Sequence, residues 1–177
     1  MHLSLLPLLP LTSQALADGA AIVAAITTIS TATTTLNTTI STFPSNPFLD
    51  LLDIGPLLTS SITLLNDINA GTHTASTSAN LTLLETISVA QATIALASVV
   101  ESTLDTIVAA KTQFDKLVVV SPVILLNLKE ELQATDRFGE AVTSKVPVAV
   151  QATASGLLAP INAAFNEAIG VYEQFAL

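Results

Sequence analysis

The chain has 177 residues, with fourteen acidic and five basic side chains, and its formal net charge is −9. Half of its residues are hydrophobic and 4% are aromatic, a composition and length that fit one domain with a core of its own. The absence of cysteine excludes disulfides, thiolate metal sites and cysteine nucleophiles, and the acidic balance argues against nucleic acid as a partner.

The first seventeen residues have the pattern of a secretory signal peptide. They are rich in leucine and end in the small-x-small triplet Ala15-Leu16-Ala17. A basic residue, usual near the start of such a signal, is missing. The alternative is a buried N-terminal helix, which Pro7 and Pro10 disfavour because proline removes a helical donor. We therefore expect a signal peptide over residues 1–17 and one domain over residues 18–177.

No later segment is expected to span a membrane. Residues 19–49 are uncharged, but threonine clusters, Asn37, Asn46 and two prolines interrupt them. The sequence thus predicts a soluble, secreted protein that is not transmembrane.

Apolar residues recur at helical spacing in the first segment of the predicted domain. Steps of four and three residues persist for three heptads, which favours a helix over a strand despite the low helix propensity of threonine. Pro44-Ser45-Asn46-Pro47 is expected to end this helix. Its apolar face comprises Ile22, Ile26, Ile29, Thr33, Leu36, Ile40 and Phe43.

A second helix is expected to be kinked at Gly55-Pro56 and to end either at Gly71-Thr72-His73 or near Ser78. Asn80 is a plausible N-cap for a third helix. The face of the second helix comprises Leu51, Leu58, Ile62, Leu65 and Ile68. That of the third comprises Leu84, Ile87, Gln91, Ile94, Ser98, Leu104, Val108 and Phe114.

Ser121-Pro122 indicates the start of a fourth helix, with serine as the cap and proline in the first turn. A fifth helix is expected from about Pro147, bent at Pro160. Their faces comprise Leu125, Leu128, Leu132, Thr135, Phe138 and Val142, and Val150, Ala154, Leu157, Ile161, Phe165, Ala168, Tyr172 and Phe175. The fold class predicted is all-α, a five-helix antiparallel bundle.

Catalytic groups are scarce. His73 is the one histidine of the predicted mature chain, expected in an exposed loop, and it has no evident relay partners. Glu130-Glu131 is the only adjacent acidic pair, and neighbouring helical residues point in different directions. The sequence has no glycine-rich phosphate loop and no metal-ligand cluster. It therefore predicts a protein that is not an enzyme and has no cofactor or metal.

The apolar faces leave two structures open: an ordinary packed core, or a central apolar tunnel suited to an acyl chain. The side chains that would line the tunnel are Ile26, Ile29, Leu58, Ile62, Leu65, Leu84, Ile87, Val108, Phe114, Leu125, Leu128, Phe138, Val142, Leu157, Ile161, Phe165 and Tyr172. Polar residues on the same faces are candidates to hydrogen-bond a head group, although bonds within or between helices are the alternative: Thr33, Gln91, Ser98 and Thr135.

Two sequons are candidates for N-glycosylation in a secreted chain. Asn80 lies at a predicted helix start and is the better acceptor. Asn37 flanks the apolar face of the first helix, where a glycan would compete with packing.

Several motifs, taken in order, resemble one fungal family. They are Ala109-Ala110-Lys111-Thr112-Gln113-Phe114-Asp115-Lys116-Leu117, Leu125-Leu126-Asn127-Leu128-Lys129, Thr135-Asp136-Arg137-Phe138, Ser144-Lys145-Val146-Pro147 and the ending from Ile161 to Tyr172. With Ile26-Thr27-Thr28-Ile29-Ser30 near the start, the sequence is similar to the hydrophobic surface binding protein A family, also called antigenic cell wall galactomannoproteins.

This resemblance implies an extracellular or loosely wall-associated helical protein that adheres to hydrophobic surfaces. It also implies a fatty acid or other amphiphile between the helices, and recruitment of a secreted lipid-polymer hydrolase. The leading hypothesis is a non-catalytic protein that binds such a lipid or surface. The alternative is a structural or antigenic cell-surface glycoprotein with a packed core and no small-molecule ligand.

Overall fold

The computed structural model describes residues 11–43, 54–117 and 120–174, with side chains described from residue 18. Its elements are α1 (Leu11–Ser41), α2 (Ile54–Thr77), α3 (Leu83–Phe114), α4 (Val120–Lys145), the 3₁₀ turn η2 (Val148–Val150), α5 (Gln151–Gly156) and α6 (Ala159–Glu173). These ranges contain no strand. The predicted all-α, five-helix fold is confirmed, with the fifth helical segment divided into η2, α5 and α6.

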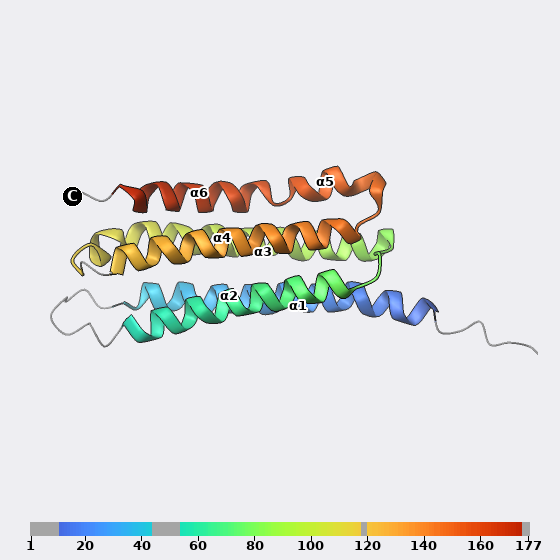
Figure 1. The fold of residues 1–177 in the computed structure, drawn as a ribbon, viewed down its shortest axis with the longest axis horizontal. Helices are drawn as coiled ribbons and strands as arrows, with labels where there is room; N and C mark the ends of the chain where they lie inside the picture. The colour runs from blue at the N-terminus through green and yellow to red at the C-terminus, as the bar shows by residue number, and fades with distance from the viewer. Residues whose placement is uncertain (1–10, 44–53, 118–119, 175–177) are drawn as a thin grey trace, which may run out of the picture.

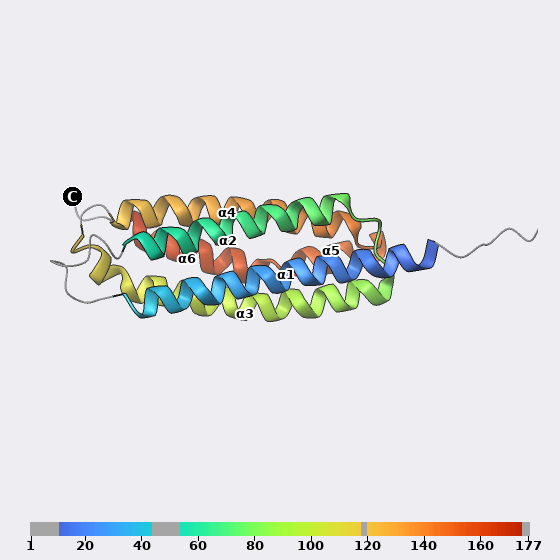
Figure 2. The same cartoon turned by 90° about the horizontal axis from the view of Figure 1, so that it is seen from below.

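The helices surround the core as a closed ring rather than in chain order. Helix α1 packs against α2 and α3, α2 packs against α4, and α6 packs against both α3 and α4. Consecutive helices run antiparallel along the long axis, as Figure 1 and the perpendicular view in Figure 2 show. Helices α3 and α4, although consecutive, have few contacts. The inward faces of all five segments therefore meet along one axis.

The predicted buried face of α1 is correct at every position. Ile22, Ile26, Thr33 and Ile40 are among its residues, and none is more than 3% exposed. The threonines between them keep helical geometry by donating to carbonyls four residues earlier; Thr27 Oγ1 lies 2.9 Å from the Val23 oxygen. The hydroxyls of the threonines from Thr27 to Thr39 are thus satisfied within the helix itself.

The structure differs from two predictions for α2, the kink at Pro56 and the loop position of His73, and it decides between the two predicted C-terminal ends. Pro56 lies in the first turn of the described helix, where its missing N–H costs no intrahelical bond, so it does not kink the helix. The helix continues past Gly71 to Thr77, which supports the longer alternative and places His73 on an exposed helical surface instead of in a loop. The predicted residues Pro44, Pro47 and Leu51 lie outside the described residues.

Helix α3 begins with a capping box at Thr82, not at Asn80. The Glu85 N–H donates to Thr82 Oγ1 at 3.3 Å, and the Thr82 N–H donates to Glu85 Oε2 at 2.9 Å. The Gly19 N–H donates to the other carboxylate oxygen at 3.3 Å. The hydrogen bond from the Thr82 side chain is the main cause that lowers the pKa of Glu85. One carboxylate thus caps α3 and fastens it to α1.

The starts of the last two predicted helices also differ. The described part of α4 begins at Val120, and Ser121 donates to Asp115 Oδ1 at 2.7 Å instead of capping α4. Pro160 lies in the first turn of α6, where it begins a helix and does not bend one. Phe175, assigned to this face, lies outside the described residues.

Three helical segments are long and apolar enough to cross a membrane by length and composition: Asp18–Ser41 in α1, Leu83–Phe114 (α3) and Val148–Glu173, which comprises η2, α5 and α6. The expectation that threonine clusters would interrupt the first is therefore wrong, because their hydroxyls bond to the helix's own carbonyls. In this structure the same helices pack on one another around the shared core.

The close approach of Gly19 to Glu85 predicts a destabilising glycine-to-alanine change. A Cβ at position 19 would lie 2.7 Å from Glu85 Cβ and Cγ, so Gly19→Ala must displace the capping carboxylate. We expect a loss of about 1 kcal/mol or more in the free energy of unfolding. Gly170→Ala is the matched control, because an added Cβ there meets nothing within 4 Å. It should gain roughly 0.5–1 kcal/mol from helix propensity. Equal gains for both variants in urea unfolding would contradict the packing account.

Candidate functional site

Three cavities follow one another along the axis of the helical ring. The α5 cavity, of about 120 Å³, lies between α3, α4 and the η2–α5–α6 segment. The central cavity, of about 30 Å³, is lined by α1, α2, α3, α4 and α6. The α2 cavity, of about 220 Å³, lies among α1, α3, α4 and the first two turns of α2. Most of the lining side chains are aliphatic or aromatic, and the others include several threonines, Ser61, Asn127 and Glu131.

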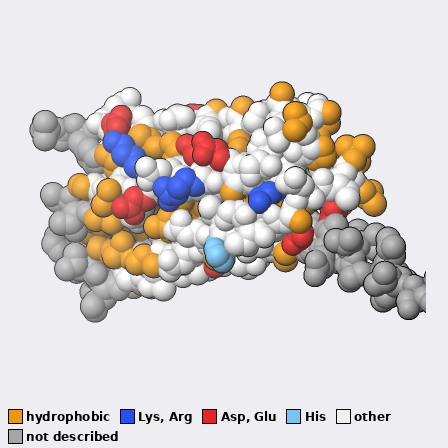
Figure 3. Space-filling model, turned by 45° about the vertical axis from the view of Figure 1, so that its right-hand side comes forward, with side chains coloured by type: hydrophobic (Ala, Val, Ile, Leu, Met, Phe, Trp, Pro, Cys, Tyr) orange, Lys and Arg blue, Asp and Glu red, His pale blue; other side chains and the backbone are white. Residues whose placement is uncertain are grey.

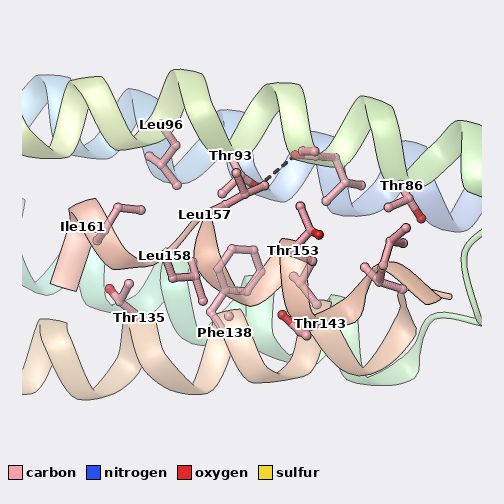
Figure 4. A pocket seen from close by; sticks show the side chains of 17 residues that line it. Thr86, Thr93, Leu96, Thr135, Phe138, Thr143, Thr153, Leu157, Leu158 and Ile161 are labelled. Carbon is pink, nitrogen blue, oxygen red and sulfur yellow. Dashed lines mark hydrogen bonds between the residues drawn. The ribbon is translucent and has the colours of Figure 1, made fainter. Parts of the chain in front are cut away.

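The α5 cavity shows how the wall is built (Figure 4). Phe138 from α4 stands beside Leu158 from the α5–α6 junction, and Leu96 and Thr93 reach in from α3. Thr93 Oγ1 donates to the Val89 carbonyl at 2.9 Å, so this hydroxyl is satisfied within its own helix. The surface offered to an occupant is therefore mainly hydrocarbon.

Neighbouring cavities share side chains. Phe138 and Ile161 line both the α5 cavity and the central cavity. Leu36, Ile107 and Glu131 line both the central cavity and the α2 cavity. Leu96 and Thr135 are also shared by the α5 cavity and the central cavity. Rotamer changes in such shared side chains are the means by which the three cavities would join into one path.

Glu131 is the one ionisable residue on the walls of these cavities. It is 3% exposed, and Ser61 Oγ donates to its Oε1 at 2.7 Å. Within the described ranges no hydrogen bond to its second carboxyl oxygen is formed. Burial raises the pKa of Glu131 to about 7, against the opposing effect of the Ser61 hydrogen bond. A carboxyl group thus stays protonated to unusually high pH inside an apolar wall.

Sequence reasoning noted Glu131 only as part of an acidic pair and missed its position. The spacing contained the signal, since Ile124, Leu128, Glu131 and Phe138 follow helical steps and are all buried. A glutamate in phase with such residues points inward with them. Glu130, one residue earlier, is exposed.

Eight of the seventeen predicted tunnel residues line one of the three cavities, and two predicted polar residues do so as well. The aliphatic and aromatic ones are Ile29, Leu58, Leu128, Phe138, Val142, Leu157, Ile161 and Phe165. The polar ones are Thr33 and Thr135. Thr33 Oγ1 donates to the Ile29 carbonyl at 2.8 Å, which is the within-helix alternative for its hydroxyl.

Six further predicted residues belong to the core but do not line these three cavities. Ile26, Phe114 and Tyr172 are buried, and Leu65, Val108 and Leu125 are half-buried. Tyr172 donates its hydroxyl proton to the Ile107 carbonyl at 2.7 Å, which fixes α6 on α3. These side chains pack in the core outside the three cavities and support the residues that line them.

Five predicted residues lie on the surface, so their assignment to the interior is wrong. Ile62 is 58% exposed and Leu84 is 69% exposed, and Ile87, Gln91 and Ser98 are exposed as well. In α2 the inward position beside Ile62 belongs to Ser61, which pairs with Glu131. In α3 the capped Glu85 is buried on the same face as Val89 and Leu96. Both inward faces therefore combine apolar side chains with a buried polar contact.

On the face shown in Figure 3 the Lys and Arg side chains lie among Asp and Glu side chains. His73 is exposed. Among the described residues no group of three or more His, Asp or Glu side chains is placed to hold a metal ion.

The ring of five helices and the row of apolar cavities inside it define the class of protein: an all-α bundle with apolar cavities between its helices. The family model for hydrophobic surface binding protein A matches residues 19–144, and the chain belongs to this family. The resemblance read from the sequence motifs is thereby confirmed. No protein with a curated description matches the chain.

Solved structures with the same fold carry lipids. The crystal structure of AFMP4P in complex with palmitic acid has a TM-score of 0.80 and 27% identity, covering 87% of this chain and 99% of that one. Ligand binding domain 1 of the Penicillium marneffei MP1 protein, complexed with arachidonic acids, has a TM-score of 0.80 and 17% identity over 88% and 98% of the two chains. Domain 2 of that protein, complexed with multiple arachidonic acids, has a TM-score of 0.79 and 17% identity over 88% and 96%.

The buried carboxyl predicts an unusual dependence of stability on pH. Between the ordinary value of 4.5 and about 7, the folded chain holds the Glu131 proton more tightly than the unfolded chain does, because burial raises the pKa of this group. The contribution of Glu131 to the free energy of unfolding therefore falls as pH rises through this window, by about 3 kcal/mol, and is constant above it.

Urea unfolding of the ligand-free chain from pH 4.5 to 8.5 measures this effect. Glu131→Gln should remove the fall attributable to this residue, whereas Glu130→Gln, which changes the exposed neighbour, should retain it. Superimposable pH profiles for the two variants would show that Glu131 titrates normally.

Proposed function

We propose that this chain binds a long-chain fatty acid or a similar amphiphile between its helices, without catalysis. The observation that carries the proposal is the row of three apolar cavities that share walls along the bundle axis. Each buried methylene of an acyl tail contributes about 0.8 kcal/mol before the costs of binding. Palmitic acid in the AFMP4P structure, which shares 27% identity with this chain, supports the ligand class.

The cavities also bear on the alternative of a purely structural glycoprotein with a filled core. A filled core would leave no space between the helices for an acyl tail, whereas the partly open α2 cavity alone measures about 220 Å³. The proposal assigns this space to the ligand. The predicted lining residues Phe138, Ile161 and Phe165 would contact its tail.

A second mode, adsorption to hydrophobic surfaces, is supported by an exposed apolar stripe on α3. Leu84, Ile87 and Ile94 are 69%, 49% and 56% exposed and share one side of the helix. The stripe would lie against an apolar solid. Replacing all three with serine should then weaken retention on alkyl-coated beads, whereas Ile62→Ser, at an exposed isoleucine of α2, should not. Recruitment of a secreted lipid-polymer hydrolase to such a surface rests on the family resemblance.

Secretion, loose association with the cell wall and glycosylation complete the proposal. A signal peptide over residues 1–17 would leave the domain 18–177. Asn80 is exposed in the connection between α2 and α3, as an acceptor must be, whereas Asn37 lies within α1 with its buried Oδ1 unpaired. The intact mass of the secreted chain, before and after glycosidase treatment, reports both the cleavage and the glycan; an unprocessed mass would count against both.

Blocking the α5 cavity should weaken binding of palmitate. Ala154 lines this cavity, so Ala154→Phe would fill space meant for the tail. If the ring displaces two methylenes, the loss is on the order of tenfold in affinity. Ala152→Phe places the same ring at an exposed position of α5 and is the matched control.

Native mass spectrometry and calorimetry with delipidated protein and palmitate measure the effect. A single retained palmitate on the unmodified chain and on Ala152→Phe, with weaker binding to Ala154→Phe, is the expected outcome. No palmitate on the unmodified chain, or equal affinity for all three proteins, would contradict binding in the interior.

A further inference from the structure

The boundary between the central cavity and the α2 cavity carries a polar pair that a hydrocarbon tail does not need. Glu131 from α4 and Ser61 from α2 are both buried, and they are joined by the 2.7 Å hydrogen bond from Ser61 Oγ to Glu131 Oε1. Glu131 lines both cavities, and Ser61 lines the α2 cavity. A polar group inside an apolar wall is costly unless something pairs with it.

The second oxygen of this carboxyl group is available to a ligand. Within the described ranges it forms no hydrogen bond, although the residue is only 3% exposed. The cavities on either side of it are the space from which a partner would approach. An occupant with a hydrogen-bonding head group at this boundary would satisfy the oxygen that the protein leaves unpaired.

No buried cation compensates Glu131. From the facing helices, the two cavities are lined by residues such as Thr33 and Leu36 of α1, Ser61 of α2 and Thr103 of α3, and by Ile161 of α6. None of the described lining residues other than Glu131 ionises. The charged neighbour along its own helix is Glu130, whose negative charge adds to the burial that keeps Glu131 protonated.

We propose that the Glu131–Ser61 pair is the head-group site for a fatty acid, and that the two carboxyl groups bind as an acid–carboxylate pair sharing one proton. The inference rests on the proposed binding of an amphiphile in the interior and specifies where its polar end lies. No covalent bond changes: one O–H, on either carboxyl, donates to an ionised oxygen of the other, and the pair carries one negative charge.

This arrangement makes retention of the fatty acid dependent on pH. Two carboxylates in contact cannot both ionise without strong repulsion. Once pH rises far enough to remove the shared proton, the head group is expelled from the boundary. The site therefore holds a fatty acid under acidic conditions and releases it under alkaline ones. Glu131 is the charged group at the site, and the exposed Glu130 next to it in α4 adds repulsion of the same sign.

The test compares palmitate affinity from pH 5.5 to 8.5 for the full chain, Glu131→Gln and Glu130→Gln, using delipidated protein. Because free palmitate ionises identically in all three experiments, a difference between the full chain and Glu131→Gln reports the Glu131 carboxyl group. We expect the affinity of the full chain to fall at least tenfold between pH 6 and pH 8. Glu130→Gln should show the same fall with its midpoint at slightly lower pH, because loss of the Glu130 charge removes a small cause of the raised pKa of Glu131. Glu131→Gln, whose amide donates at every pH, should bind more tightly than the full chain at pH 8 and vary less.

If Glu131→Gln does not fold, a second variant, at Ser61, tests the head-group assignment. Ser61→Ala removes the hydrogen bond that favours the charged form of Glu131. The midpoint of palmitate release should then move to higher pH, a shift that loss of packing alone would not produce.

Hexadecanol, which does not ionise, distinguishes the head-group class. Its affinity for the full chain should lack the alkaline fall seen for palmitate. Parallel palmitate profiles for the full chain and Glu131→Gln, or an unmoved midpoint in Ser61→Ala, would overturn the head-group assignment while leaving interior binding intact. Absence of palmitate binding by any protein at any pH would instead refute the proposed function itself.

Discussion

The constraint on which this structure depends is the closure of five helices into a ring. In a regular ring with neighbouring axes 8–10 Å apart, each axis lies about 7–8.5 Å from the centre, whereas a helix with its side chains has a radius of about 5–6 Å. The centre must be filled by large side chains or remain hollow. This chain has one tyrosine, six phenylalanines and no tryptophan, and its inward faces are mostly aliphatic. The row of cavities is the consequence.

The sequence predicted the fold well because helical periodicity is a strong signal where the two sides of a helix differ. In α1 the contrast between isoleucine and threonine is sharp, and every predicted inward residue is buried. In α3 leucine and isoleucine occur on more than one side. Periodicity alone then could not choose the buried face, which also carries the contact between Gly19 and Glu85.

The candidate site was less predictable than the fold, again because periodicity alone does not identify every residue that faces inward. Leu128, Val142 and Ile161, which line the cavities, followed from spacing, but Val123 and Ile124 did not. Glu131 was considered only as half of an acidic pair, although its spacing places it inward. Its partner Ser61 lies seventy residues away in sequence, and pairs of this kind are visible only in three dimensions. Prolines were misread in a similar way: Pro56 and Pro160 both lie in first turns of helices, where they are tolerated, so local rules placed them correctly only once the helix starts were known.

The central claim is that the ligand lies inside the ring and not on its surface. Intermolecular nuclear Overhauser effects between ¹³C-labelled palmitate and methyl-labelled protein test it most directly. The account predicts contacts from the tail methylenes to Leu36 and Ile161, both almost fully buried. Contacts confined to Leu84, Ile87 and Ile94, on the exposed side of α3, would contradict it.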